Sequence, residues 1–301
     1  MRISILQRLA SGEVLIADGA TGTMLQAAGL PTGMPGEAWV LERPEEIMKL
    51  HRAYVEAGSQ LILTTTFGGT RARLKHVLSV SEGKAGLDVQ VSEINTRAAE
   101  LARRVAGDDL YVGGDIGPTG EMMAPIGPLT YAAAVELFAE QAQALASGGA
   151  DVIYIETMSD LNEAKAAVEG ARQACDLPVF CTFSFDTHGR TSMGVSPTQA
   201  AQAMAVLGVP ATGANCGHAP EELLDILPQM RQAAPDAYLI AKPNAGVPRM
   251  VKRQVVYDAT PERMAELALR YVELGARIVG ACCGSSPAHI SAIREAVMRD
   301  E

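Results

Sequence analysis

Three of the five cysteines stand at the ends of two short apolar segments. Cys216 lies near the end of residues 210–217, and Cys282 and Cys283 lie near the end of residues 277–284. Three thiolates that meet at one point form a soft site suited to Zn²⁺, with a fourth coordination position left open. Neighbours in a strand point to opposite faces, so Cys282 and Cys283 can share one ion only if the chain bends, which Gly284 permits.

Spacing alone leaves other interpretations of these thiols open, because Cys282 and Cys283 do not form a Cys-x-x-Cys pair. Both could be buried core residues, or they could form a vicinal disulfide that acts as a redox switch. Cys181 lies inside an apolar segment and Cys175 near the end of a helical one, so we interpret both as small buried hydrophobes.

A zinc ion held by three cysteines would favour a particular reaction. Three thiolates overcompensate its charge, which makes it a poor Lewis acid for activating water, but it can still bind a substrate thiol as the thiolate. The implied reaction class is therefore alkyl transfer to sulfur.

The elements that would position these residues alternate along the chain. Most of the predicted strands are continuous apolar runs, as in a parallel sheet buried on both faces, and helical patterns lie between them. With no linker between these units, the pattern predicts α/β architecture as a single (β/α)8 TIM barrel, one domain over residues 1–301. The competing doubly wound sheet would favour a Gly-x-Gly-x-x-Gly turn after the first strand, and the segment Asp18–Thr23 lacks that spacing. The predicted strands are residues 14–18, 60–67, 110–117, 151–157, 178–185, 210–217, 237–244 and 277–284; the main predicted helices are residues 44–57, 131–147, 197–207, 220–234, 261–274 and 287–298.

In such a barrel the working residues lie at the carboxyl ends of the strands. Polar residues and thiols do stand there: Asp18 at the end of the first strand, Glu156 at the end of the fourth, Asn215 and Cys216 at the end of the sixth, and Cys282 and Cys283 at the end of the eighth. The sequence therefore predicts that these residues meet at one rim of the barrel.

Composition limits the kinds of partner. The chain has 301 residues, 48% of them hydrophobic, and a formal net charge of −10, which argues against a nucleic-acid partner. No apolar run is long enough to cross a membrane, and the amino-terminal run is too short for a secretory signal. We therefore expect a soluble, cytoplasmic protein with no membrane partner.

With these residues in view, the chain resembles the homocysteine S-methyltransferase family. That family includes the homocysteine-binding barrel of cobalamin-dependent methionine synthase and betaine–homocysteine methyltransferase. The matching segments run in order over nearly the whole chain: residues 18–23, 65–68, 115–118, 155–157, 213–217, 243–246 and 280–284. One departure is Thr65, where many relatives carry Asn.

The resemblance implies roles residue by residue. Cys216, Cys282 and Cys283 would hold the zinc, with the sulfur of homocysteine as the fourth ligand and no catalytic side chain beyond this activated thiol. Glu156 would bind the substrate ammonium group. The turn Asp18, Gly19 and Ala20 would position the substrate backbone, with main-chain N–H groups facing its carboxylate. Asn215 would contact the metal-binding cysteines and hold them in position without binding the metal itself.

The sequence does not identify the methyl donor. Members of the family use methylcobalamin, betaine, S-methylmethionine or S-adenosylmethionine, and any cobalamin would be carried by a separate protein. Trp39, the single tryptophan, lies in the segment Pro31–Trp39 and does not by itself make the aromatic cage that a betaine would need. We expect this segment and Asn244–Asp258, both interpreted as long loops, to order around substrate and donor.

The sequence thus predicts a zinc-dependent homocysteine S-methyltransferase. Two alternatives remain: a non-enzymatic thiol protein that senses zinc or redox state, and zinc-dependent methyl transfer to a different thiol or to a selenol. Glu156 separates an amino-acid acceptor from a bare thiol, because only the former needs a partner for an ammonium group.

Overall fold

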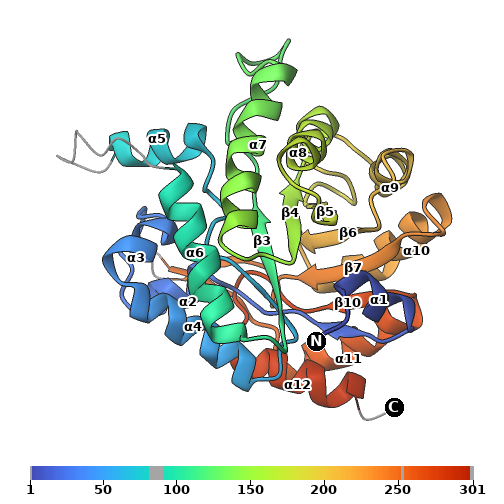
Figure 1. Ribbon diagram of the computed structural model, residues 1–301. Helices are drawn as coiled ribbons and strands as arrows, with labels where there is room; N and C mark the ends of the chain where they lie inside the picture. Colours follow the sequence, from blue (N-terminus) through green and yellow to red (C-terminus); the bar gives the residue numbers. More distant parts are fainter. Residues whose placement is uncertain (1, 81–90, 252–253, 299–301) are drawn as a thin grey trace.

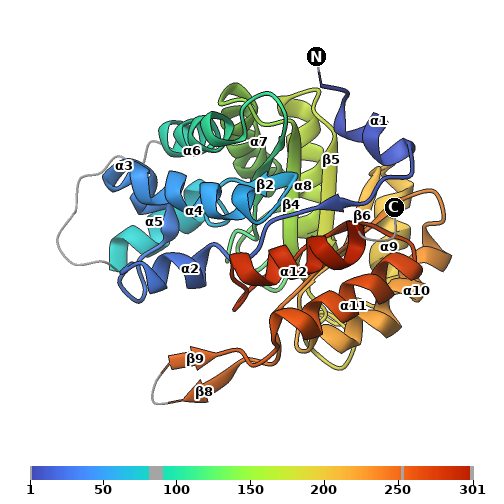
Figure 2. The same ribbon diagram turned by 90° about the horizontal axis from the view of Figure 1, so that it is seen from below.

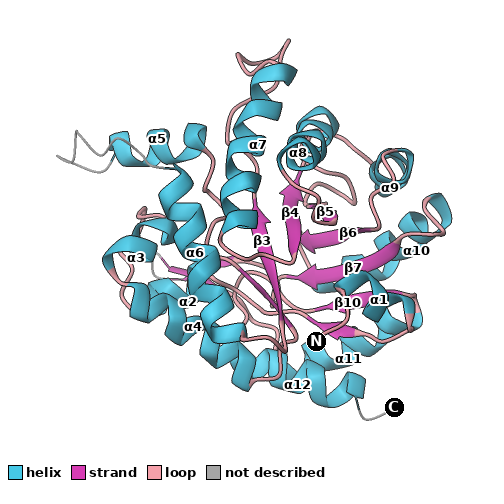
Figure 3. Cartoon of the chain, viewed as in Figure 1, coloured by secondary structure: helices cyan, strands magenta, loops and turns pink. Residues whose placement is uncertain are grey.

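Eight parallel strands form a closed barrel in the computed structural model, which describes residues 2–80, 91–251 and 254–298 (Figures 1 and 3). The strand order is β1-β10-β7-β6-β5-β4-β3-β2. A parallel bridge between Ala17 and Leu61 joins the two outer strands, and the Gln60 amide donates to the Ile16 carbonyl at 2.7 Å. The predicted (β/α)8 fold is therefore confirmed. The strands are β1 Leu15–Ile16, β2 Leu61–Leu63, β3 Tyr111–Ile116, β4 Val152–Met158, β5 Val179–Phe183, β6 Ala211–Cys216, β7 Tyr238–Pro243 and β10 Ala276–Val279.

Helices surround the barrel, and the six that the sequence analysis delimited lie where it predicted (Figure 3). Several begin at a capping side chain: Ser196 accepts from the Gln199 amide at 3.2 Å, and Thr260 accepts from the Arg263 amide at 3.3 Å. The helices are α1 Ile5–Ala10, α2 Gly22–Ala27, α3 Gly36–Glu42, α4 Pro44–Glu56, α5 Arg71–Val80, α6 Val91–Ala106, α7 Tyr131–Ser147, α8 Leu161–Ala174, α9 Pro197–Val206, the 3₁₀ turn η1 Pro220–Glu222, α10 Leu223–Ala233, α11 Pro261–Glu273 and α12 Pro287–Val297.

The barrel interior is a packed core of its own, separate from the larger layer between strands and helices. Helix α1 closes one end, since Ile5 and Leu9 belong to the same cluster as the inward strand residues. Tyr154 and Ile240 are among those inward residues. Because side chains alternate along a strand, Glu156 and Lys242 also point inward, one layer nearer the opposite end.

Two segments differ from the expected loops. The segment Asn244–Asp258 contains an antiparallel hairpin, β8 Arg249–Val251 and β9 Gln254–Val256, which projects from the barrel in Figure 2. Trp39 lies within α3 rather than in a loop, is buried, and is covered by the Arg43 guanidinium 4.9 Å from its ring. No helix of the described residues is both long and apolar enough to span a membrane.

Candidate metal and substrate site

The structure brings together the three cysteines that the sequence singled out. The Sγ atoms of Cys216 and Cys282 are 2.7 Å apart, those of Cys216 and Cys283 are 4.0 Å apart, and all three lie within 4.8 Å of one another. All are free thiols and only partly buried, so a ligand can reach them. Three sulfur donors match the donor number and chemistry of a zinc site that keeps one position for a substrate.

Cys216 is turned toward its partners by an unusual backbone. It ends β6 with a φ of 54°, and Gly217 follows with a φ of 80°. A left-handed conformation at a residue other than glycine costs on the order of 1–3 kcal/mol and persists only where the surroundings hold it.

Cys282 and Cys283 lie beyond the last strand, because β10 ends at Val279. The Cys282 amide donates to the Pro243 carbonyl at 2.7 Å, and the Cys283 carbonyl accepts from the Ala245 amide at 2.9 Å. Gly284 then turns the chain with a φ of 80°. The alternation of side chains that applies within a strand therefore does not separate the two thiols.

Asn215 joins the cysteines to the neighbouring strands. Its Oδ1 accepts from the Thr182 hydroxyl at 2.6 Å and from the Thr157 amide at 2.8 Å, and its Nδ2 lies 4.0 Å from the Cys282 sulfur. The side chain is buried and has little freedom. It thus lies beside the sulfur cluster and is hydrogen-bonded to β4 and β5.

A cavity of about 420 Å³ opens beside the three sulfur atoms. Gly19 and Ala20, which the sequence predicted to contact substrate, line it, and so does Thr65. The segment 33–37 borders it on the outer side. The residues that line the cavity include Gly19, Ala20, Thr65, Phe67, Arg73, Asp115, Glu156, Thr157, Cys216, Lys242, Cys282 and Cys283.

Asp18 has its partners within the protein. Its Oδ1 is 2.9 Å from the Lys242 ammonium, and its Oδ2 accepts from the Leu63 amide at 2.7 Å. It is not among the cavity-lining residues, whereas Lys242 is. The Ala20 amide, expected to face a substrate carboxylate, donates to the Ser285 hydroxyl at 3.0 Å.

Lys242 is a functional candidate that the sequence analysis missed. It is 2% exposed, and its ammonium lies 5.5 Å from the centre of the Tyr154 ring. Burial by itself lowers the pKa of Lys242, but Asp18, Tyr154 and Glu156 together outweigh that effect and raise the pKa above its usual value. A lysine two residues after Ile240 in an apolar strand was the signal that could have identified it.

Two carboxyl groups share the cavity wall with Lys242. Burial raises the pKa of Glu156 to about 8, the Cys282 thiol adds to the rise and Lys242 opposes it. Burial, followed by the charge of Glu156, also raises the pKa of Asp115, whose Oδ1 has no hydrogen-bond partner within the described residues. An incoming cation would stabilise the ionised form of either group.

The other two cysteines lie outside the cluster, as does His218, two residues after Cys216. Cys181 is fully buried in β5, and the Cys175 sulfur lies 3.5 Å from the Ala171 carbonyl at the end of α8. His218 is exposed and lies 3.2 Å from Glu222. The position of Cys181 agrees with the interpretation as a small buried hydrophobe, whereas Cys175 is only partly buried.

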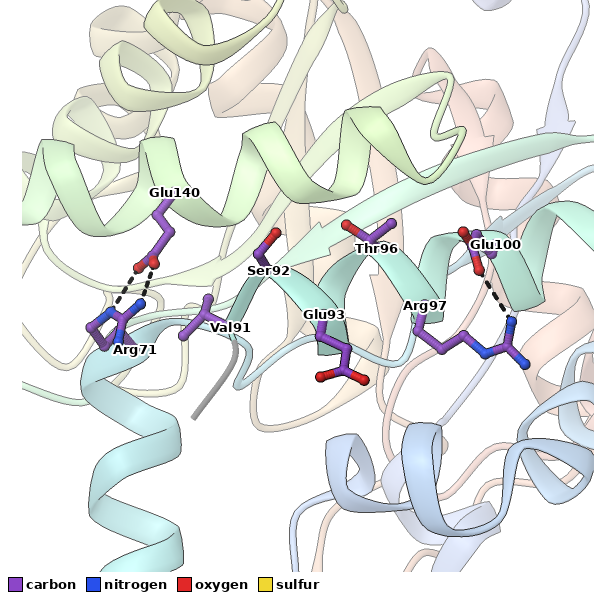
Figure 4. A pocket seen from close by; sticks show the side chains of 8 residues that line it. All are labelled: Arg71, Val91, Ser92, Glu93, Thr96, Arg97, Glu100 and Glu140. Atoms are coloured by element: carbon purple, nitrogen blue, oxygen red, sulfur yellow. Dashed lines mark hydrogen bonds and ion pairs between the residues drawn. The ribbon is translucent and has the colours of Figure 1, made fainter. Parts of the chain in front are cut away.

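A wider groove of about 550 Å³ lies on the outer helical surface, along α6 and beside α7 (Figure 4). An ion pair between Arg71 and Glu140 lies at one end of it. None of the predicted site residues lines this groove. We assign it no function.

Fold and side chains together define a class of protein: a (β/α)8 barrel with three thiols beside a cavity that Asp115, Glu156 and Lys242 help to line. Comparison with known proteins narrows that class. A sequence profile of the homocysteine S-methyltransferase family matches residues 15–297, so the chain belongs to that family. The prediction that it is an enzyme of this kind is confirmed at the level of the family.

Curated relatives include methionine synthase of Mycobacterium tuberculosis (strain ATCC 25618 / H37Rv), 34% identical over 306 residues. This alignment covers 95% of the present chain and 25% of that protein. Methionine synthase of Mycobacterium leprae (strain TN) is 33% identical over 98% of the chain and 25% of its own length. The chain spans about a quarter of the length of these relatives.

Among solved structures, the metallated form of the homocysteine methyltransferase MmuM from Escherichia coli superposes with a TM-score of 0.78. The two chains are 24% identical, over 96% of this chain and 98% of that one. A methyltransferase from Methanosarcina mazei gives a TM-score of 0.59 at 13% identity, over 99% of both chains. These likenesses support the fold.

Proposed function

We propose that the chain transfers a methyl group to the thiol of homocysteine, giving methionine, with Zn²⁺ as its cofactor. The observation that carries the proposal is the group of three free thiols within 4.8 Å of one another beside a cavity lined by Glu156 and Lys242, in a chain of the homocysteine S-methyltransferase family. Family membership favours an enzyme over a non-enzymatic thiol sensor. Free thiols of this kind also agree with a cytoplasmic location.

Cys216, Cys282 and Cys283 would hold the metal. Once bound, zinc keeps a substrate thiol deprotonated at neutral pH and leaves it nucleophilic. The rest of the chemistry that we assign belongs to the side chains of the cavity. Asn215 fixes the position of Cys282, and the left-handed turn at Cys216 and Gly217 directs its sulfur to the same point.

The acceptor would lie along the cavity wall formed by β1, β4 and β7. Glu156 is 8% exposed and lines the cavity, so its carboxylate can receive the ammonium group of an amino acid out of contact with bulk water. The turn at Gly19 and Ala20 bounds the same space. Asp18 acts from behind this wall, through its ion pair with Lys242.

The methyl donor would enter from the open side of the cavity, bordered by the segment 33–37, Phe67 and Arg73. Both a small-molecule donor and methylcobalamin carried by a separate protein belong to this proposal. A methyl-transfer assay on the zinc-loaded protein, with homocysteine and a panel of donors, identifies the class of methyl donor that the protein uses.

Replacing one sulfur tests the proposal directly. Cys283→Ala removes one of three metal ligands, so we expect zinc retention after dialysis and methionine formation to be lost together. Metal analysis and product quantification measure the two effects. Cys175→Ala, a half-buried cysteine at the end of α8, is the matched control and should retain both. If Cys283→Ala forms methionine at the wild-type rate after metal removal, the proposed mechanism is wrong.

A further inference from the structure

The ammonium group of Lys242 has an incomplete set of hydrogen-bond partners. It carries three donors, and among the described residues one acceptor, Asp18 Oδ1 at 2.9 Å, lies within hydrogen-bond distance. The nearby Tyr154 ring offers a face, not a lone pair. A side chain that is 2% exposed has little access to bulk water. A buried ammonium in this state favours a further anionic or carbonyl partner.

The open side of Lys242 faces the cavity. Lys242 lines it together with Glu156, while its partner Asp18 does not. The alternation of side chains along a strand explains this arrangement. Lys242 follows the inward-pointing Ile240 by two residues on β7, and Glu156 follows the inward-pointing Tyr154 by two residues on β4. The cavity lining therefore presents a carboxyl group from β4 and an ammonium group from β7.

Asp18 is not free to bind a ligand of its own. Both of its oxygens are engaged, one by Lys242 and the other by the Leu63 amide at 2.7 Å. Its charge offsets that of Lys242 and holds the ammonium in place. The Ala20 amide is also engaged, by the Ser285 hydroxyl. Two groups expected to contact the substrate backbone thus have partners already, and Lys242 has donors to spare.

We propose that Lys242 binds the carboxylate of the amino-acid acceptor and makes the site selective for thiols that carry that carboxylate. The inference rests on the proposed function and deepens it. Glu156 takes the ammonium end and Lys242 the carboxylate end, so the cavity matches a zwitterion rather than a simple thiol. The pairing leaves the thiol end of the acceptor for the three cysteines.

The test compares homocysteine with two analogues, each of which lacks one of its two charged groups. Homocysteine carries both charges, 3-aminopropane-1-thiol lacks the carboxylate, and 4-mercaptobutyrate lacks the ammonium. Equilibrium binding of each to the zinc-loaded protein is measured by calorimetry, without any methyl donor. Wild type should bind homocysteine on the order of 10- to 100-fold more tightly than 3-aminopropane-1-thiol, as expected for a hydrogen bond to a charged group.

Lys242→Met removes the ammonium and keeps most of the side-chain volume. It should weaken homocysteine binding by that same factor and leave 3-aminopropane-1-thiol binding unchanged. Glu156→Gln should show the reverse selectivity, losing the preference for homocysteine over 4-mercaptobutyrate. Lys49→Met, at an exposed lysine of α4, is the control and should bind all three ligands as wild type does.

Each outcome decides between distinct interpretations. If Lys242→Met weakens both amine-bearing ligands equally, Lys242 acts on the whole cavity and the carboxylate assignment is overturned. Lys242→Met leaves Asp18 unpaired, which could prevent folding. In that case the double variant Asp18→Asn/Lys242→Met, which removes both charges, is used in the same binding test. Wild-type selectivity in that double variant also overturns the inference. Failure of wild type to bind homocysteine at all would instead contradict the proposed function.

Discussion

At the scale of single residues, two of the side chains at the site belong to residues whose backbone is strained. Thr157 has a φ of 62° and Cys216 a φ of 54°, and a positive φ is unusual for residues other than glycine, most of all for a β-branched one. Asn215 contacts both regions, since it is bonded to the Thr157 amide and precedes Cys216 in the chain. We interpret the strain as the cost of bringing Glu156 and Cys216 to the same cavity.

His51 offers a test at the same scale. It is buried in α4, and its Nε2 has no hydrogen-bond partner among the described residues. Burial lowers the pKa of His51 to about 4, although the charge of Asp18 opposes the shift. Between pH 6.5 and 4 the unfolded chain therefore binds a proton that the folded chain does not. Its contribution to stability is present above pH 6.5 and is lost as the pH falls toward 4, on the order of 3 kcal/mol in all.

His51→Leu should remove this part of the pH dependence. Urea unfolding at pH 7.5, 6 and 5 measures the free energy of unfolding of wild type and variant. We expect the wild type to lose more stability on acidification than His51→Leu does. His218→Asn, at an exposed position, should follow the wild-type curve. Parallel curves for wild type and His51→Leu would show that His51 is not held neutral by burial.

At the scale of elements, the register of the strands sets the cavity wall. Thr65, Glu156 and Lys242 each follow an inward residue by two positions, and Asp115 follows the inward Tyr111 by four. The four side chains therefore form a polar layer above the apolar interior. The pairing of Asn215 with Lys242 and of Cys216 with Pro243 keeps β6 and β7 in step up to the sulfur cluster.

Gly213 tests that pairing. A Cβ atom at this position would lie 2.0 Å from the Ile240 carbonyl oxygen of β7, a backbone atom that cannot move alone. We expect Gly213→Ala to destabilise the protein by about 3 kcal/mol or more and to weaken zinc retention, because β6 leads directly to Cys216. Thermal unfolding and metal analysis measure the two effects.

Gly22 is the matched control for this substitution. It lies at the start of α2, and no atom is within 4 Å of a Cβ built there. Gly22→Ala should leave the melting temperature close to that of wild type or raise it slightly. Equal stability of the two variants would mean that β6 and β7 are not packed as closely as described.

At the scale of the whole molecule, two segments far apart in sequence border the sulfur site. Residues 33–37 line the cavity, and Ala245 is bonded through its amide to the Cys283 carbonyl and through its carbonyl to the Ala259 amide. The hairpin β8–β9 is thereby anchored at its base beside the three cysteines. Movement in either segment would reach the cavity.

Hydrogen exchange tests this coupling. We expect slower exchange in peptides from Pro31–Trp39 and Asn244–Asp258 when homocysteine and a productive donor are added, because both segments should order around the bound pair. Peptides from α8, away from the cavity lining, serve as the reference and should not change. Unaltered exchange in both segments would contradict the expectation that they order on binding.

The sequence by itself was enough for the barrel and for the three cysteines. Strands buried on both faces are continuous apolar runs, and helix starts carry Pro, Ser or Thr for reasons of local hydrogen bonding. Both patterns can therefore be recognised in the sequence alone. Only the tertiary structure decided what Asp18 and Lys242 do. Their ion pair joins residues more than two hundred positions apart, and no local pattern encodes such a contact. The left-handed turns at Thr157 and Cys216 were equally hidden, since packing around Asn215 and not intrinsic preference stabilises them.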